Sequence, residues 1–330
     1  MAVTANTNET YDVSTIREDL SEAMASITPT ETLLMSTIGT RNVDNTYFEW
    51  SEVDLAATGA NRQIEGDVGL SNTAPTNAVR KGAYTQISAK VVEVSSTNQA
   101  VNGVANAQTV AKQVAYKLSE LKRDMEAMLL ANVPSAGGAS GTARQTAGLP
   151  AYLTTNVSRG GSGANGTTSG AGESGFVNAA ATDGTLRPIT EALLKGVIAD
   201  CWNSGATPKV VMCGSAQKQK ISTFTGNATR FKEAEDSKLN AAIDVYVSDF
   251  GEVQIVPNRH MRVRTVSSVD YTPDVLVLDP SYAEVAYLQT AKQEPLAKTG
   301  LSERRLISCE YGLQVTSQKA HGIVADINAS

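Results

Sequence analysis

The stretch that decides the fold is AQTVAKQVAYKLSELKRDMEAMLLAN, residues 107–132. Apolar side chains recur every three or four positions, the spacing of one face of an α-helix; they are Val110, Val114, Leu118, Leu121, Met125 and Met128/Leu129. Charged side chains occupy the other faces: Lys112, Lys117, Glu120, Lys122, Arg123 and Glu126. The pattern predicts one amphipathic helix of about 25 residues, near 38 Å long. It persists for only about three heptads, which favours a helix crossing a sheet or an elongated domain over a coiled coil.

Two segments before this helix are rich in β-branched and aromatic residues and predict strands. They are TYFEWSEVDLA, which starts at Thr46, and AYTQISAKVVEVS, which starts at Ala83. About 25 residues with hardly any large apolar side chains separate them, and so long a connection is usually functional or unstructured. We interpret the region as a long two-stranded flap. Because an isolated hairpin is barely stable in water, such a flap is expected to lie on another surface.

The flap carries charged residues that are candidates for an assembly interface: Arg62, Glu65, Asp67, Arg80 and Lys81. One interpretation is that these charges only keep an exposed loop soluble. The other is that they pair across a subunit interface, where charge complementarity sets register and specificity more than affinity. The sequence leaves both open.

Residues 158–175, SRGGSGANGTTSGAGESG, raise a separate question because seven of them are glycine and almost none can pack. The stretch could be an interdomain linker, a phosphate-binding loop or a flexible insertion. Gly161–Gly166 formally matches G-x-G-x-x-G. A dinucleotide loop needs a buried strand before it and a helix after it, and neither flank fits. We therefore expect no bound cofactor.

Beyond this stretch, residues 185–224 predict a helix–strand–helix unit around the buried-type strand KVVMCG. The remaining residues predict strands, including a hairpin at Asp249–Gly251 and the runs DVLVLDP, EVAYLQ, RRLISCEYGLQVTSQ and HGIVADI. Long helices and segregated strands together indicate an α+β fold.

At the other end, the apolar residues of DVSTIREDLSEAMASIT, residues 12–28, predict a helix that Pro29 ends, followed by a short turn over residues 31–38. This helix could be peripheral, or it could be an arm that reaches onto a neighbouring subunit. The sequence begins without the basic and apolar regions of a signal peptide.

The composition and the absence of known motifs argue against several classes of function. The chain has 330 residues and a formal net charge of −6, which argues against a basic nucleic-acid-binding domain. Cys201, Cys213 and Cys309 fit neither a disulfide framework nor a metal site. His260 and His321 have no metal-ligand neighbours at the usual spacings. No apolar run is long enough to cross a membrane, and no catalytic motif is present. We expect no metal, no cofactor and no enzymatic activity.

The order of these features resembles the major capsid proteins of tailed bacteriophages, which have the HK97-type fold. The amino-acid sequences of four segments are similar to those of one branch of that family, which was once catalogued as a domain of unknown function. The segments are PTETLLMSTIG (29–39), ARQTAGLPAYLTTNVSRG (143–160), WNSGATPKVVMCGSAQKQKISTF (202–224) and CEYGLQVTSQKAHGIVADI (309–327).

The resemblance implies a division of the chain. Residues 1–42 would form the N-terminal arm and short helices, and residues 43–98 the extended loop, or E-loop, that lies over an adjacent subunit. Residues 99–184 would form the peripheral domain, with the spine helix at 107–132 and a glycine-rich insertion at 135–175. Residues 185–288 would form the axial domain, and residues 289–330 would be C-terminal strands completing the peripheral domain.

The resemblance also implies a function: self-assembly into pentamers and hexamers of an icosahedral head that encloses double-stranded DNA without sequence-specific binding. Expected partners are a scaffolding protein, a portal and a decoration protein, and no membrane. Assembly would take place in the cytoplasm of the bacterial host and the product would be the virion capsid. No lysine–asparagine pair for covalent cross-linking aligns. The alternatives are an encapsulin-like shell around protein cargo, another structural component such as a tail or surface-layer protein, and an unrecognised hydrolase.

Overall fold

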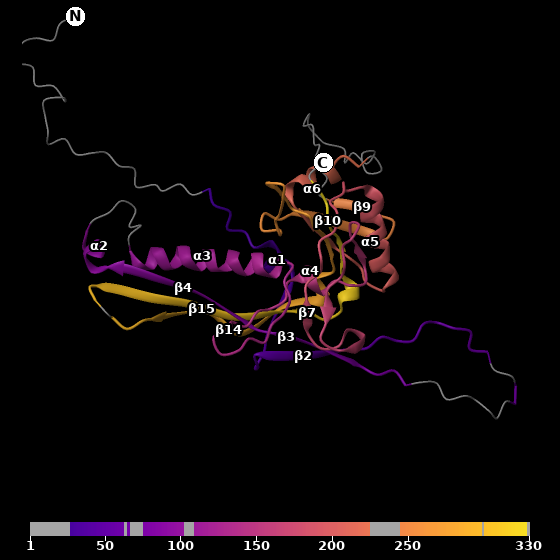
Figure 1. Ribbon diagram of the computed structural model, residues 1–330, viewed down its shortest axis with the longest axis horizontal. Coiled ribbons are helices and arrows are strands. Elements are labelled where there is room, and N and C mark those ends of the chain that lie inside the picture. The colour runs from indigo at the N-terminus through magenta and orange to yellow at the C-terminus, as the bar shows by residue number, and fades with distance from the viewer. Residues whose placement is uncertain are drawn as a thin grey trace, which may run out of the picture.

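The computed structural model describes residues 27–62, 65–66, 75–101, 109–224, 245–298 and 300–328. The helix expected at 107–132 is present as α3, Val110–Leu129. It lies along one face of a sheet with strand order β1-β14-β15-β4 (Figure 1). These strands are β1 (Gly39–Asn42), β14 (Ala283–Pro295), β15 (Ser302–Val315) and β4 (Gln86–Ser95). The helix therefore crosses a sheet, as its length indicated.

Strand β4 differs from the predicted E-loop boundary at residue 98. It pairs antiparallel with β15 from Gln86↔Tyr311 to Ser95↔Ser302. Its Val92 and Val94 are buried in the core below α3. Only β2 (Tyr47–Glu52) and β3 (Val79–Tyr84) pair as the hairpin, so the protruding part is shorter than 43–98. The strand pattern alone could not separate β3 from β4, because Thr85 is the single residue between them.

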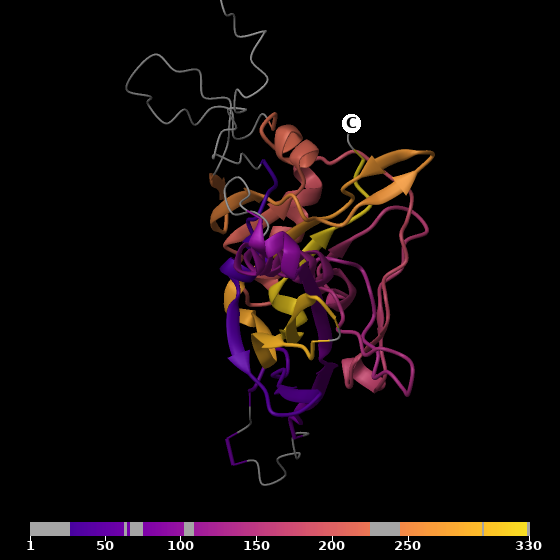
Figure 2. The same cartoon turned by 90° about the vertical axis from the view of Figure 1, so that its left-hand side faces the viewer.

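The second half of the molecule is built on a six-stranded sheet with order β5-β16-β13-β8-β10-β9. Its strands are β5 (Val157–Ser158), β16 (Gly322–Val324), β13 (Val275–Leu278), β8 (Val210–Cys213), β10 (Gly251–Pro257) and β9 (Val245–Ser248). Helices α5 (Glu191–Asn203) and α6 (Ser215–Ile221) accompany it (Figure 2). The helix–strand–helix unit and the hairpin at 249–251 are confirmed.

Both faces of the central strands are buried, which explains their continuous apolar sequences. Val211 of β8 and Val277 of β13 pack in the core that contains α5. Met212 and Leu276 of the same strands face the core that contains α3. The six-stranded sheet therefore separates two hydrophobic cores.

Strand β16 also differs from expectation, since it lies in this six-stranded sheet and not with β14 and β15. It pairs with β13 and, in parallel, with β5. The C-terminal residues therefore return to the half of the molecule that residues 185–288 were expected to form. The apolar run GIVADI suits a strand covered on both faces.

The remaining elements are short. They are α1 (Leu33–Thr37), α2 (Ser96–Ala100), α4 (Leu149–Tyr152), β6 (Thr167–Thr168), β7 (Val177–Ala179), β11 (Arg264–Val266), β12 (Val269–Tyr271) and the 3-10 turns η2 (Ala171–Glu173), η3 (Pro280–Tyr282) and η4 (Gln318–Ala320). Helix α1 confirms the turn predicted over 31–38. The helix predicted before Pro29 lies almost wholly outside the described residues.

Glu126 is not on a solvent face of the long helix, as the periodicity suggested, but is completely buried. Its Oε1 accepts hydrogen bonds from the Leu34 amide at 2.6 Å and from Asn258 Nδ2 at 2.8 Å, and its Oε2 accepts one from the Met35 amide at 3.0 Å. The carboxylate therefore joins α3 to the first turn of α1 and to the end of β10. Three donors compensate for the cost of burying a charge.

The glycine-rich residues 158–175 run from the six-stranded sheet to the β2–β3 hairpin and are part of the same fold. No helix follows Gly166, so the dinucleotide interpretation is wrong on geometry. Gly160 is required by close packing, because a Cβ there would lie 2.0 Å from the carbonyl oxygen of Thr185. Its amide donates to the buried carboxylate of Asp326 at 3.0 Å.

Asp326 anchors this segment to its surroundings. Besides Gly160, it accepts hydrogen bonds from the Gly184 amide at 2.8 Å and from Arg264 Nη1 at 2.9 Å. Next to it, Arg262 bridges Asp183 and Asp274 through bonds of 2.8–3.1 Å. Burial raises the pKa of Asp274, and the guanidinium of Arg262 opposes the rise. The cluster fixes the glycine-rich segment in one path.

Unfolding should become easier on mild acidification because of His321. Burial lowers the pKa of this imidazole from 6.5 to about 4. Between about pH 6.5 and pH 4, His321 is protonated in the unfolded chain but stays neutral in the folded chain. The free energy of unfolding therefore decreases as the pH falls through this range. Between pH 7 and pH 5 we expect a loss of about 2 kcal/mol, measured by denaturant unfolding. His321→Gln should reduce this loss, and an unchanged pH dependence in that variant would contradict the assignment.

Candidate functional site

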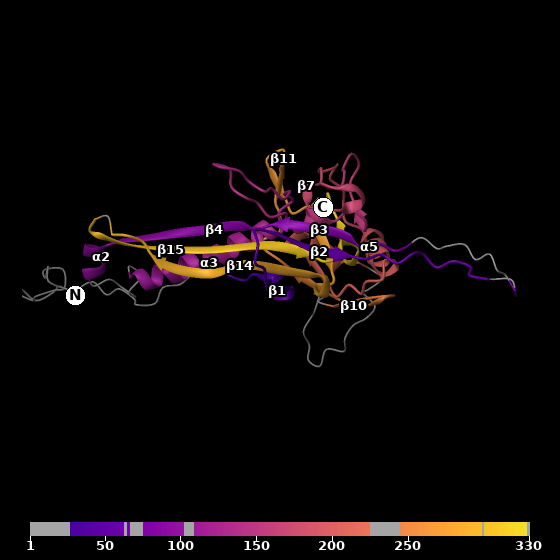
Figure 3. The ribbon, with the colours of Figure 1, turned by 90° about the horizontal axis from the view of Figure 1, so that it is seen from below.

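The candidate site is the β2–β3 hairpin and the polar cluster at its base. The two strands pair in register from Tyr47↔Tyr84 to Glu52↔Val79. Residues 53–62 and 75–78, on the far side of these strands, run out well beyond the other described residues (Figure 3), and all of them are exposed. Two of the exposed side chains are large and apolar, Val53 and Leu55. The hairpin thus leaves the molecule with little cover from its own chain.

Alternating side chains fix the base of the hairpin to the body. Phe48 and Trp50 point inward and are buried, and Trp50 Nε1 donates to the Thr316 carbonyl at 3.3 Å. On the other side, the rings of Tyr47 and Tyr84 lie 4.7 Å apart, and Phe176 meets Tyr84 edge-on at 5.1 Å. Because successive side chains of a strand point to opposite faces, the face that carries Phe48 and Trp50 can be buried against the body of the protein.

One residue of the glycine-rich segment, Gly175, forms a parallel β-bridge to this ribbon at Lys81. The Gly82 amide donates to the Gly175 carbonyl, and the Gly175 amide donates to the Arg80 carbonyl, both at 2.9 Å. Gly175 adopts a φ of +80°, a conformation that glycine takes without steric cost. This pairing stabilises the direction of a hairpin that two strands alone would hold weakly.

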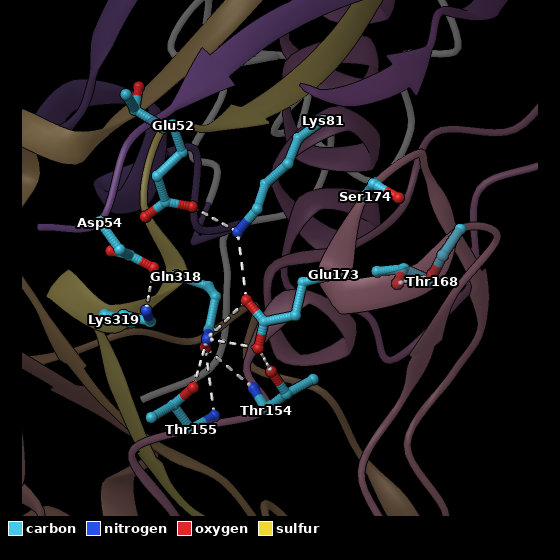
Figure 4. Close-up of polar contacts among 12 residues, drawn as sticks. Glu52, Asp54, Lys81, Thr154, Thr155, Thr168, Glu173, Ser174, Gln318 and Lys319 are labelled. Atoms are coloured by element: carbon cyan, nitrogen blue, oxygen red, sulfur yellow. Dashed lines mark hydrogen bonds and ion pairs between the residues drawn. The ribbon is translucent and has the colours of Figure 1, made fainter. Parts of the chain in front are cut away.

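Lys81 lies at the centre of the polar cluster (Figure 4). Its Nζ lies 2.5 Å from Glu52 and 3.4 Å from Glu173, and the residue is only 8% exposed. Glu173 also accepts hydrogen bonds from Thr154 Oγ1 and from Gln318 Nε2, each at 3.2 Å. One carboxylate therefore ties together the hairpin, the loop after α4 and the C-terminal segment.

Two further contacts complete the cluster. Gln318 Oε1 accepts hydrogen bonds from the Thr154 and Thr155 amides, both at 3.1 Å. Lys319 pairs with Asp54, where the hairpin strand has just ended. The hollow beside these groups has a volume of about 20 Å³, which is room for about one water molecule. The arrangement can hold the hairpin in place but has no space for a substrate.

The structure separates the five residues predicted for an assembly interface. Arg62 and Glu65 lie in the exposed loop, and Arg80 is exposed beside Glu49 at 3.6 Å. Lys81 points inward, and its charge pairs within its own chain. Asp67 lies outside the described residues. No local sequence pattern indicated Glu52, Glu173 or Gln318, because their roles depend on segments far apart in the chain.

Within the described residues, no group of three or more His, Cys, Asp or Glu side chains is arranged to hold a metal ion. Among the described helices, none is both long and apolar enough to cross a bilayer. Cys201, Cys213 and Cys309 are buried free thiols, and burial raises their pKa values to between about 11 and about 12. Thiols with raised pKa values in apolar surroundings are unreactive.

Solved structures with the same fold cover nearly the whole chain. The capsid structure of the cyanophage P-SCSP1u has a TM-score of 0.61 at 12% identity, over 99% of this chain and 97% of that one. Gordonia phage Cozz gives the same TM-score and identity, over 99% and 98%. An encapsulin complex from Synechococcus elongatus has a TM-score of 0.56 at 11% identity, over 96% and 94%. The α+β architecture is therefore the HK97-like capsid fold, which both kinds of shell share.

Sequence comparison distinguishes phage capsid from encapsulin. The major capsid protein of Escherichia phage Phieco32 is 24% identical over 351 residues, which cover 95% of each protein. The family model described as SU10 major capsid protein matches residues 3–328. The chain accordingly belongs to the SU10 major capsid protein family and is a structural protein of the virion capsid of a tailed phage, not an enzyme.

Proposed function

We propose that copies of this chain form pentamers and hexamers that close into an icosahedral head around double-stranded DNA. The observation that carries the proposal is the β2–β3 hairpin, whose base is fixed by Lys81, Glu52 and Glu173 while residues 53–62 are exposed. A loop that projects from a fixed base can lie on the next copy, and such head-to-tail contacts close into rings. In this proposal Arg62, Glu65, Asp67 and Arg80 contact the neighbouring subunit.

An exposed aromatic pair supports the second contact that capsomers need. Trp202 at the end of α5 and Phe250 in the β9–β10 turn have ring centroids 5.0 Å apart. They are 51% and 36% exposed, and exposed aromatic side chains are typical of interface anchors. We place this half of the molecule, residues 185–288, at the centres of pentamers and hexamers as the axial domain. The sheet beneath α3 then belongs to the peripheral domain.

Family membership supports further partners as part of this proposal. They are a scaffolding protein that would set the size of the head, a portal through which DNA would enter, and a decoration protein that would add to the outer surface. Contact with the enclosed DNA would be independent of sequence.

Electron microscopy of the chain, expressed alone and with a candidate scaffolding protein, tests the proposal. Closed and roughly isometric shells are expected in at least the second sample. A uniform small particle in both samples would remove the assembly proposal. Tubes or sheets would point to a different structural component of the phage.

Exchanging the charges of the exposed loop should block assembly without unfolding the chain. In Arg62→Glu/Glu65→Lys the net charge is unchanged, but each loop would meet like charges, which cost several kcal/mol at an interface. We expect the shell yield to fall at least about tenfold, while the free energy of unfolding changes by less than about 0.5 kcal/mol. Glu294→Lys/Lys298→Glu, an equal exchange at exposed positions of the β14 end, is the control. Normal shells from the loop variant would exclude these two residues from the interface.

A further inference from the structure

The side of α3 that faces away from the sheet carries basic residues and no free carboxylate. Lys112, Tyr116 and Lys122 are exposed, and Arg123 is half-buried. At 100° per residue, Lys112, Tyr116 and Arg123 fall on the face opposite Leu121, and Lys122 lies on its flank. Figure 1 shows α3 lying along β4 and β15, and Leu121 is buried in the core that α3 shares with this sheet. We call these four residues the basic stripe.

The acidic residues of the same helix are all paired within the chain. Asp124 lies 2.6 Å and Glu120 3.5 Å from Lys90 of β4. Glu120 also accepts from Lys117 at 2.7 Å, and the hydrogen bond to Asp124 raises the pKa of Lys90. The remaining acid, Glu126, is buried against α1. All three carboxylates of α3 therefore have ion-pair or hydrogen-bond partners within the chain.

Among the described residues, the cations of the basic stripe have no such partners. In the part of the chain that the structure describes, no carboxylate lies within ion-pair distance of Lys112, Lys122 or Arg123. The Nε of Arg123 is shielded from solvent and has no hydrogen-bond partner there. In a chain with a net charge of −6, where acids outnumber bases, three unpaired cations on one helix face are not expected by composition. They form a surface complementary to a polyanion.

The length of the basic stripe suits a phosphate backbone. Lys112 and Arg123 are eleven positions apart, which is about 17 Å along a helix. Phosphates follow one another about every 3.4 Å of duplex axis along each strand, so the stripe spans roughly five of them. The phenol of Tyr116, which lies between the cations, can donate a hydrogen bond to a phosphate oxygen.

We propose that the basic stripe of α3 contacts the phosphate backbone of the enclosed double-stranded DNA. The inference rests on the proposed function, since the DNA must lie inside the shell. Contacts to phosphate carry no sequence information. Three cations per copy give a weak contact, with an expected slope of log affinity against log salt of about −3. Repetition over the shell multiplies the contact by avidity while each single contact stays easy to break.

The test is binding of the unassembled protein to a 40-base-pair duplex of arbitrary sequence, followed by fluorescence anisotropy between 50 and 200 mM salt. The variant is Lys112→Gln/Lys122→Gln/Arg123→Gln. Its control is Lys209→Gln/Lys220→Gln/Lys298→Gln, which removes the same charge from exposed positions elsewhere. We expect wild type and control to bind alike with a slope near −3, and the stripe variant to lose at least about tenfold in affinity and most of the slope.

Three results would overturn the inference: equal losses in the stripe variant and the control, no salt-dependent binding by the wild type, or a stripe variant that binds DNA normally but no longer forms shells. The last would mean that an acidic protein segment occupies the stripe. Electron microscopy of the wild type and both variants, each expressed with the candidate scaffolding protein, separates this question from the proposed function. If the wild type forms no shells, the proposed function fails whatever the anisotropy shows, and if shells form, only the anisotropy decides the role of the stripe.

Discussion

Glu126→Ala is expected to lower the free energy of unfolding by about 4 kcal/mol. The carboxylate is completely buried and accepts hydrogen bonds from Leu34, Met35 and Asn258. Its removal leaves three buried donors without an acceptor and a cavity where the side chain was. Each unsatisfied buried donor costs about 1–3 kcal/mol, reduced where the chain can relax toward water. The loss should appear in denaturant unfolding of the unassembled protein as a lower transition midpoint.

Glu120→Ala on the same helix is the matched control. Glu120 is partly exposed and pairs with Lys117 and Lys90, so its loss should cost no more than about 1 kcal/mol. Glu126→Gln keeps the size of the side chain but turns an NH₂ group toward backbone N–H donors, so an intermediate cost of about 2 kcal/mol is expected. Equal stability of the Glu126→Ala and Glu120→Ala proteins would show that this buried network does not hold α1 and β10 to the long helix.

Gly160→Ala should destabilise the protein by about 3 kcal/mol, although alanine generally stiffens a chain. A Cβ at this position would lie 2.0 Å from the Thr185 carbonyl oxygen and 3.0 Å from the Asp326 Cβ. Neither is the far end of a flexible side chain, so the backbone must move. That movement would also lengthen the hydrogen bond from the Gly160 amide to Asp326. Thermal or denaturant unfolding measures the effect.

The control is Gly196→Ala in the middle of α5, where an added Cβ meets nothing within 4 Å. There the substitution should stabilise the protein by about 0.5–1 kcal/mol, because alanine loses less backbone entropy in a helix than glycine. Opposite signs at the two positions would mean that glycine at 160 serves packing. If both substitutions stabilised the protein, the backbone around residue 160 would accommodate a Cβ at little cost. Flexibility of the glycine-rich segment, which its composition suggested, would then be its main property.

Local patterns of residues were enough to predict most individual helices and strands. The three- and four-residue spacing from Val110 to Leu129 gave α3, and the apolar runs gave β8 and β13. Asp249–Gly251 predicted the β9–β10 turn, where Gly251 takes a φ of +135°. These features depend on residues a few positions apart, since periodicity and turn geometry are local properties of the chain. The resemblance of four segments to the capsid family added the overall fold.

Which distant segments come into contact could be seen only in the folded chain. Glu126 looked solvent-facing by periodicity, yet α1, some 90 positions earlier, covers it. Lys81 looked like a loop charge, yet Glu173, 92 positions later, pairs with it. The sequence of β4 is typical of a flap strand, yet β4 pairs with β15, more than 200 positions later. Contacts of this kind depend on the path of the whole chain, and a local pattern carries no information about which distant partner will cover or neutralise a given side chain.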